Sequence, residues 1–252
     1  MVSKADAQPP PYHPEIVILS GSGLSAESGI ETFRGEGGVW ENYRIEDVAS
    51  PEAFKQSPDK VHSFYNMRRK QLYSSDIKPN KAHEALARLT NELGKNVLLV
   101  TQNVDNLLEK AGAKGVMHMH GELAKIRCEN CATVREWKGD LSVETECTIC
   151  HQSGSLRPYI VWFGEIPFGL ELIYTALANC KLFASIGTSG SVYPASGFVQ
   201  EARKGTCERT VEINPERTEI SAFFDEHREG PASKMVPRFV EEVLKSDKYK
   251  KA

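Results

Sequence analysis

The 252-residue sequence contains no apolar run long enough to cross a bilayer, which argues against a membrane-spanning protein. It also lacks an excess of charge of either sign. Its 31 lysines and arginines nearly balance 34 aspartates and glutamates, for a formal net charge of -3, so no basic field attracts nucleic acid or anionic lipid. Residues 1–14 resemble neither a secretory signal nor an Arg- and Ser-rich transit peptide, and we expect a disordered tail there.

Cysteine is also scarce, and its spacing does not indicate a disulfide framework. Four of the six cysteines form two C-x-x-C pairs that are separated by fifteen residues: Cys128, Cys131, Cys147 and Cys150. Two such pairs present four thiolates to one tetrahedral zinc ion. Four thiolates leave no open coordination position, so we expect one structural zinc per chain. Reduced thiols favour the cytoplasm, and the mitochondrial matrix is compatible with the same composition.

Four short apolar runs are typical of buried parallel strands, and each ends in a polar or glycine-rich turn: 15–20, 96–101, 181–186 and 210–213. The expected helices are 58–72, 80–93, 106–111, 170–178, 195–203 and 234–244. This pattern predicts an α/β fold with a Rossmann-like, doubly wound parallel sheet and a smaller domain. The larger domain is expected to comprise 15–40, 82–122 and 159–252, and the smaller one a helical module (41–81) and a zinc-binding module (123–158).

The first predicted strand leads directly into a G-x-G-x-x-A turn at residues 21–26. Glycines in such a turn let backbone N–H groups approach a pyrophosphate, which the following helix N-terminus also favours. The acid that follows this turn by about twenty residues in dehydrogenases is missing. In its place is a glycine-rich stretch from Gly29 to Gly38, which we interpret as a loop that can close over a ligand.

A second group of polar residues follows the strand at 96–101. Gln102, Asn103 and Asp105 come first, and His120 lies about fifteen residues further on. Histidine is the natural proton acceptor near neutral pH, so His120 is a candidate base. The residues alone leave a plainer interpretation open, in which Asn103 and Asp105 only cap the next helix. His118 is the rival candidate for the base.

Together these motifs resemble those of the sirtuins, the NAD-dependent protein lysine deacylases, over about residues 15–244. Two departures matter. Glu31-Thr32 replaces Pro-Asp in the cofactor loop, which resembles a bacterial branch (class III), and Leu108 stands where a histidine is common. The matching segments are 21–25 for G-A-G-x-S, 29–34 for G-I-P-D-F-R, 102–105 for Q-N-x-D, 120–121 for H-G, the four cysteines, 187–189 and 213–214.

The resemblance implies an NAD-dependent mechanism. The acyl-lysine carbonyl oxygen attacks the ribose as nicotinamide leaves, and His120, aided by Asn103, deprotonates a ribose hydroxyl. The products are nicotinamide, free lysine and O-acyl-ADP-ribose. The implied cofactor contacts are Gly21, Ser22, Gly23, Ser25, Ile30, Thr32, Phe33, Arg34, Trp40, Gln102, Asn103, Asp105, Gly187, Thr188, Ser189, Asn214, Glu216 and Ala232.

The resemblance also implies an acylated lysine on a protein or peptide as the partner, lying as an added strand between two segments. Tyr65 and Arg68 share one face of the helix at 58–72 and resemble the carboxylate clamp of the branch that removes succinyl and malonyl groups. Without the family context, a solvated basic face is the favoured interpretation, and Arg69→Met is expected to change little. The implied substrate contacts are Tyr65, Arg68, Val161, Phe163, Gly164, Glu165, Gly190 and Val192.

Other functions compete with this interpretation. ADP-ribosyl transfer to protein uses the same NAD chemistry. A zinc-ribbon module for nucleic acid is compatible with the four cysteines, but residues 123–158 carry five acids and no clear basic stripe. A dehydrogenase lacks support because of the missing acid. We expect no specific nucleic acid partner and no membrane partner, and we favour a monomer.

Overall fold

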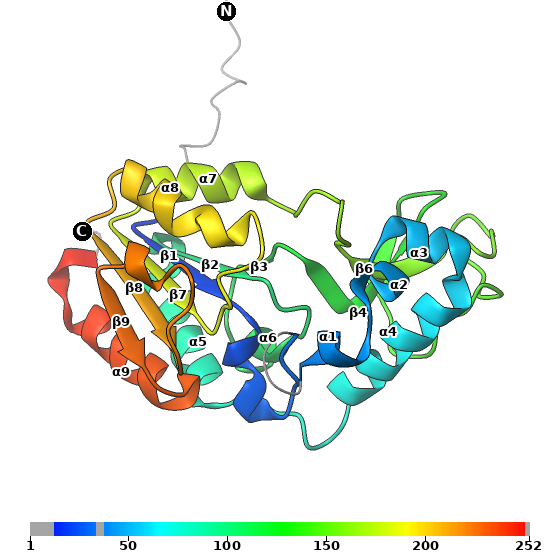
Figure 1. The fold of residues 1–252 in the computed structure, drawn as a ribbon, viewed down its shortest axis with the longest axis horizontal. Helices are drawn as coiled ribbons and strands as arrows, with labels where there is room; N and C mark the ends of the chain where they lie inside the picture. The colour runs from blue at the N-terminus through cyan, green and yellow to red at the C-terminus, as the bar shows by residue number, and fades with distance from the viewer. Residues whose placement is uncertain (1–12, 34–37, 250–252) are drawn as a thin grey trace, which may run out of the picture.

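The computed structural model describes residues 13–33 and 38–249. Arg34 and most of the predicted tail at 1–14 lie outside the described residues. The chain forms two lobes that lie side by side in Figure 1. We call them the sheet lobe, built on a six-stranded parallel sheet, and the small lobe, in which short helices cover a three-stranded antiparallel sheet.

The order of the six strands confirms the predicted α/β fold with a doubly wound sheet. The order is β3-β2-β1-β7-β8-β9 and all neighbours are parallel. The chain reverses direction across the sheet between β1 and β7, which is the point at which dinucleotide-binding sheets hold their ligand. The strands are β1 (Ile16–Ser20), β2 (Val97–Thr101), β3 (Val116–His118), β7 (Leu182–Ile186), β8 (Arg209–Asn214) and β9 (Glu226–Glu229).

Helices cover both faces of this sheet, as Figure 1 shows. Helices α5 (Lys81–Leu93) and α9 (Ala232–Lys245) pack on one face, where Ile16 and Ile18 join their core. Helices α7 (Leu170–Asn179) and α8 (Phe198–Lys204) pack on the other. Strand β1 is buried throughout, because alternate residues point into the two cores. The short α6 (Leu107–Lys110) follows β2.

The small lobe consists of the helices that precede α5 and the strands that lie between β3 and β7 in the chain. Its antiparallel strands have the order β5-β4-β6, and helix α4 coincides with the predicted helix at 58–72. The elements are α1 (Val39–Asn42), α2 (Ile45–Val48), α3 (Pro51–Gln56), α4 (Pro58–Leu72), β4 (Gly121–Cys128), β5 (Val134–Glu136) and β6 (Leu156–Ile160). Short 3-10 helices are Ser22–Leu24, Ala26–Ser28, Gly94–Asn96, Ala195–Gly197, Ser221–Phe223 and Asp247–Tyr249.

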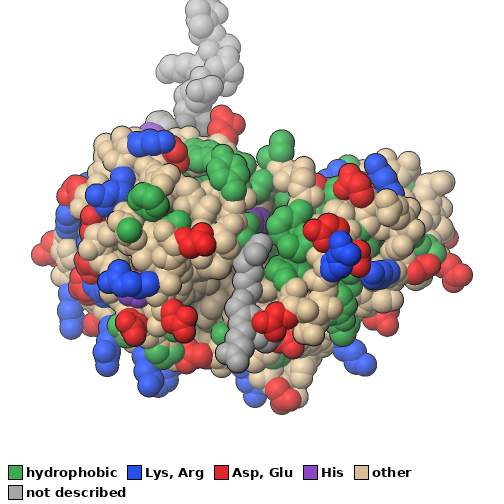
Figure 2. Space-filling model, viewed as in Figure 1, with side chains coloured by type: hydrophobic (Ala, Val, Ile, Leu, Met, Phe, Trp, Pro, Cys, Tyr) green, Lys and Arg blue, Asp and Glu red, His purple; other side chains and the backbone are tan. Residues whose placement is uncertain are grey.

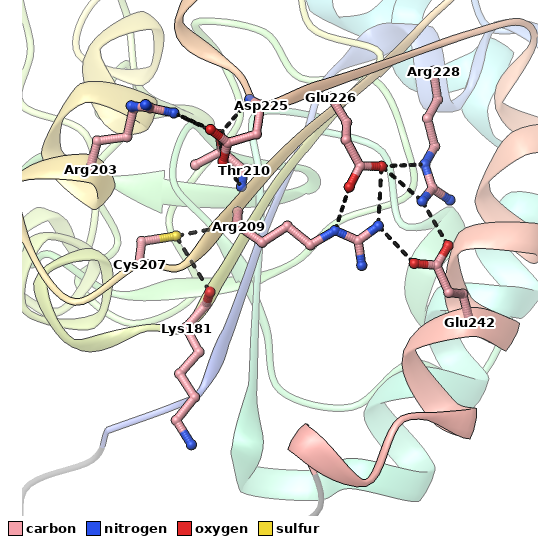
Figure 3. A network of polar contacts seen from close by, with 9 residues as sticks. All are labelled: Lys181, Arg203, Cys207, Arg209, Thr210, Asp225, Glu226, Arg228 and Glu242. Atoms are coloured by element: carbon pink, nitrogen blue, oxygen red, sulfur yellow. Dashed lines mark hydrogen bonds and ion pairs between the residues drawn. The ribbon is translucent and has the colours of Figure 1, made fainter.

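Strand β9 was not expected from the sequence, because it is too polar to resemble a buried strand. Ion pairs hold it at the sheet edge, as Figure 3 shows. Arg209 of β8 lies 2.6 Å from a carboxylate oxygen of Glu226, and Arg228 lies 2.7 Å from Glu242 of α9. Arg209 also reaches Glu242 at 2.7 Å. Charge pairing with neighbouring elements therefore replaces apolar burial at this edge. Within the described residues, no helix is long and apolar enough to cross a membrane.

Candidate active site and metal centre

A cavity of about 1150 Å³ lies between the two lobes and brings most of the predicted site residues together. Figure 2 shows hydrophobic side chains gathered along the hollow between the lobes, whereas charged side chains are spread over the rest of that face. The predicted residues that line the cavity are Gly21, Ser22, Gly23, Thr32, Phe33, Trp40, Tyr65, Arg68, Gln102, Asn103, His120, Val161, Phe163, Gly164, Glu165, Gly187, Thr188, Ser189, Val192, Asn214, Glu216 and Ala232.

A few predicted site residues do not line this cavity. Ile30 and Asp105 line a smaller neighbouring cavity, which Asn103 and Arg68 also border. Ser25 is buried behind the wall. Gly190 packs against the Ile220 side chain in the left-handed region, with φ +70°. Residues on the cavity wall that were not predicted include Ile166, Arg217 and Glu219.

The two glycine turns at the carboxyl ends of β1 and β7 pack directly on each other. The amide of Gly21 donates to the carbonyl of Ile186, and the amide of Gly23 donates to that of Gly187, each at 2.9 Å. A Cβ atom at Gly21 would stand 2.7 Å from the oxygen of Gly187, and Gly187 itself has φ +61°. Side chains are therefore excluded here, and backbone groups form the floor at the reversal point of the sheet.

His120 has the geometry of a general base. Its Nδ1 lies 3.2 Å from the carbonyl oxygen of Gln102, which can only accept, so Nδ1 carries the proton. Nε2 is then the acceptor, on a side chain that lines the cavity. Burial lowers the pKa of His120 below its ordinary value, and the Gln102 hydrogen bond opposes this only partly. The imidazole is therefore neutral and able to take a proton at pH 7.

His118, the rival candidate, has both ring nitrogens engaged. Nδ1 contacts the carbonyl oxygen of Asn103 at 3.1 Å, and Nε2 contacts a carboxylate oxygen of Glu109 at 2.8 Å. Burial acts against its charge, but the hydrogen bond and charge of Glu109 outweigh burial and raise the pKa of His118. A protonated imidazole with two acceptors cannot act as a base, so the geometry favours His120.

A buried hydrogen-bond network fixes the strand end at Asn103. The Ser25 hydroxyl donates to Asp105 at 2.9 Å and accepts from the Asn103 amide at 3.1 Å. His83, which was not predicted, completes the network. Its Nδ1 accepts from the backbone N–H of Asn80, so its Nε2 can donate to the Ser25 hydroxyl at 3.2 Å. Burial lowers the pKa of His83 to about 4. Only the Asn80-x-x-His83 capping box, at the start of α5, is a sequence signal for it.

Tyr65 and Arg68 lie together on the small-lobe wall, as their i, i+3 spacing predicted. The Tyr65 hydroxyl accepts from the indole N–H of Trp162 at 3.0 Å, which leaves its own proton free to donate. Burial raises the pKa of Tyr65, so the hydroxyl stays protonated. Arg68 lies over the ring of Phe33, with 5.2 Å between the guanidinium carbon and the ring centroid.

The structure contradicts a solvated basic face at Arg69, whereas the expectation that Arg69→Met changes turnover little stays a prediction. Arg69 is 1% exposed, and its Nε donates to the Leu123 carbonyl at 3.0 Å. Its Nη1 donates to the Asn66 side chain, also at 3.0 Å. The hundred-degree turn of the helix directs Arg69 into the small lobe rather than into solvent. Arg69 therefore joins α4 to the start of β4.

Glu165, which also lines the cavity, has a structural partner. Its carboxylate accepts two hydrogen bonds from Arg157, at 2.7 and 2.9 Å, and one from the Trp162 amide at 2.8 Å. Trp162 is buried, whereas Phe163 is 43% exposed. Trp162 therefore packs in the core of the small lobe, whereas Phe163 does not.

The four cysteines of the two C-x-x-C pairs form one cluster. Their sulfur atoms all lie within 4.8 Å of one another. Cys128 and Cys150 are 3.6 Å apart, and Cys131 and Cys147 are 3.8 Å apart. A tetrahedral zinc with Zn–S bonds of about 2.3 Å places its sulfurs about 3.8 Å apart, so the cluster is consistent with a structural zinc. The site lies at the far end of β4 from His120, which separates the metal from the cavity.

A dinucleotide-type sheet, a four-cysteine lobe and a histidine in the cleft between them define a two-lobed α/β enzyme of the nucleotide-binding class. The sequence model described as "Sir2 family" matches residues 21–194. The chain belongs to the Sir2 family. It is 53% identical over 231 residues to an NAD-dependent protein deacylase of Yersinia pseudotuberculosis, covering 92% of this chain and 83% of that protein.

Two solved structures are similar over nearly the whole chain. The crystal structure of a Sir2 homologue in complex with NAD has a TM-score of 0.80 at 36% identity, covering 91% of this chain and 89% of that one. A Sir2 variant with a deacetylated p53 peptide and 3′-O-acetyl-ADP-ribose has a TM-score of 0.77 at 27% identity, covering 90% and 92%.

Proposed function

We propose that this cleft removes acyl groups from protein lysines at the expense of NAD. The chain is an NAD-dependent protein deacylase that produces O-acetyl-ADP-ribose from acetylated substrates, as its relatives' names and bound products indicate. The observation that carries the assignment in the structure is the proton arrangement of His120, whose Nδ1 is tied to Gln102 and whose Nε2 remains an acceptor on the cleft wall. Within this chain, that is the group suited to deprotonate a sugar hydroxyl.

The residues of the cleft fit NAD, which supplies a ribose carbon that accepts the acyl oxygen as nicotinamide leaves. The glycine turns at Gly21 and Gly187 exclude side chains, so a pyrophosphate can approach the backbone closely there. Asn214 donates to the Thr188 carbonyl at 2.9 Å, which holds the far end of the cleft in shape. Asn103, fixed by Ser25, stands beside the small cavity that suits the nicotinamide amide.

We further propose that the acyl preference extends to succinyl and malonyl groups. Arg68 and the Tyr65 hydroxyl supply a cation and a neutral donor in the cavity that His120 also lines. A carboxylate at the end of an acyl chain would accept from both. The exposed Phe163 and the neighbouring Val161 and Val192 support an extended peptide across the mouth of the cleft.

The remaining proposals concern the domain boundaries, the partners and the location of the protein. The small domain combines residues 41–81 and 123–158, and the remainder from 15 to 252 binds NAD. Partners are acylated lysines on proteins or peptides, without nucleic acid or membrane, and the protein acts as a monomer. The four reduced cysteines support a cytoplasmic location.

Mass spectrometry of acetyl-lysine and succinyl-lysine peptides, incubated with the protein with and without NAD, tests the function. We expect free lysine peptide and O-acyl-ADP-ribose only when NAD is present, and from both substrates. Radiolabel from NAD that stays on protein would instead indicate ADP-ribosyl transfer. NADH absorbance that appears with any substrate would indicate a dehydrogenase.

A further inference from the structure

Arg68 has one ion-pair partner within the described residues, and that partner comes from the cofactor loop. Its Nη1 lies 3.6 Å from the carboxylate oxygen Oε2 of Glu31. The two side chains differ in exposure, at 8% for Arg68 and 60% for Glu31. A buried cation is thus paired with a carboxylate that reaches in from solvent.

The neighbouring buried arginines are held differently. Arg69 donates to the Leu123 carbonyl, and Arg157 donates to the Ile160 carbonyl at 2.9 Å. For Arg68, no hydrogen bond to a backbone carbonyl occurs in the described part of the chain. Burial lowers the pKa of Arg68, and the charge of Glu31 is the strongest of the effects that oppose this. The guanidinium therefore depends on an exchangeable anion.

We infer that Glu31 occupies the carboxylate position of the acyl clamp while no carboxylated acyl-lysine is bound, and that such a substrate must displace it. The inference rests on the proposed role of Arg68. One guanidinium facing two carboxylates leaves an uncompensated negative charge, so Glu31 swings into solvent when the acyl carboxylate binds. Acetyl-lysine carries no carboxylate and leaves the Glu31–Arg68 pair intact.

This makes Glu31 an internal competitor that determines specificity. The apparent affinity for a succinyl-lysine is the intrinsic affinity multiplied by the fraction of enzyme in which Arg68 is free. Pairs with one exposed partner are weak, so the reduction is about two- to fivefold. Glu31 also belongs to the loop that carries Ile30, Thr32 and Phe33, so displacement by the acyl group releases one of the contacts that hold this loop.

The test compares Glu31→Gln with the wild-type protein at saturating NAD, using succinyl-lysine and acetyl-lysine peptides of the same sequence. We expect the succinyl KM to fall about two- to fivefold, so that the ratio of succinyl to acetyl kcat/KM rises by the same factor. In an Arg68→Met background, Glu31→Gln is expected to leave that ratio unchanged, because the pair is already broken. Glu31→Ala, which has no hydrogen-bonding side chain, must move the ratio in the same direction.

Glu46→Gln is the matched control. Glu46 also pairs with an arginine, Arg44, at 3.8 Å, but it is 73% exposed and does not line the cavity. The ratio should stay at the wild-type value in this variant. An increase there equal to that of Glu31→Gln would overturn the inference, because it would reflect a general effect of lost surface charge.

The outcomes separate this inference from the proposed function. Suppose that the wild type turns over both peptides and that Arg68→Met selectively loses succinyl turnover. An unchanged or lower ratio in Glu31→Gln then overturns the role of Glu31 alone. A wild-type protein that turns over neither peptide in the presence of NAD overturns the proposed function, and this inference with it.

Discussion

The two lobes are stabilised by different means. In the sheet lobe, β1 and β2 are buried along their whole length between two layers of helices. The small lobe packs its helices around one apolar core and also buries Arg69 and Arg157, which are 1% and 6% exposed. Its zinc module has only a small apolar cluster, which lies beside the four thiols. A unit too small to bury enough apolar surface relies on metal ligation and charge-assisted hydrogen bonds. The stability of the zinc module is therefore concentrated in a few groups, whereas that of the sheet lobe is distributed.

Removing the metal should give the largest effect and the clearest contrast between the lobes. Structural zinc contributes about 10–16 kcal/mol of apparent binding free energy in zinc-finger peptides. We expect chelation or Cys147→Ser to abolish hydrogen-exchange protection in β4, β5 and β6, while β1, β2, β7 and β8 keep theirs. Elemental analysis should find about one zinc per chain. Equal loss of protection in both sheets would show that the lobes form one cooperative unit.

Replacing His120, the proposed base, should abolish deacylation without affecting stability. A positioned general base contributes about 10²–10⁴-fold to rate, so His120→Tyr should lose at least that factor in NAD-dependent deacylation and still melt as the wild type does. In the wild type, kcat/KM should be level near pH 7 and should fall as the pH drops through the His120 pKa, which burial places below 6.5. If His118→Ala were inactive and His120→Ala active, the assignment would be wrong.

Arg68→Met should change selectivity rather than stability. A charge-assisted hydrogen bond contributes about 1.5–3 kcal/mol, so succinyl turnover should fall about tenfold to a hundredfold or more. Acetyl turnover does not use the guanidinium and should survive. Tyr65→Phe removes a neutral hydroxyl and should weaken succinyl removal less. Parallel kinetics on acetyl and succinyl peptides measure this, and equal loss of both activities in Arg68→Met would falsify the clamp.

Arg69→Met, one residue along, should change stability rather than selectivity. It leaves the Leu123 carbonyl without its buried donor, at a cost of about 1–3 kcal/mol. The melting temperature should fall by about 2–4 °C per kcal/mol, while the succinyl-to-acetyl ratio stays constant. Lys70→Met is the matched control, because Lys70 is exposed on the same helix. A wild-type melting temperature for Arg69→Met would contradict the structural role.

The sequence predicted those elements whose own residues form a recognisable pattern. Continuous apolar runs located β1, β2, β7 and β8 to within a residue or two, and cysteine spacing located the metal cluster. Strand β9 and the short helices α1 and α2 were not predicted. Strand β9 is held by ion pairs with other elements, and α1 and α2 are single turns without a periodic apolar face.

The residues of the candidate site also fall into two groups, those that a local pattern predicts and those that it does not. Gln102 and Asn103 were predictable because they follow a predicted strand, and His120 because it is a histidine shortly after them and directly before Gly121. His83, Glu31 and Arg69 were not, because their roles depend on distant residues: His83 bonds Ser25, 58 residues away in sequence, and Arg69 bonds Leu123, 54 residues away. Sequence spacing identifies neighbours within one element, whereas these partners meet only after the sheet and the small lobe have formed.

Helix α4 also has a consequence for how such an enzyme can diverge. Its cleft-facing residue Arg68 makes no hydrogen bond to the backbone within the described part of the chain, while its inward-facing neighbour Arg69 joins two elements of the small lobe. Under the proposed clamp, substitutions at position 68 can therefore change the acyl group that is accepted without loss of stability. Substitutions at position 69 are selected against because they lower the stability of the fold. A step of one residue, about 100° around the helix, thus separates a variable position from a constrained one.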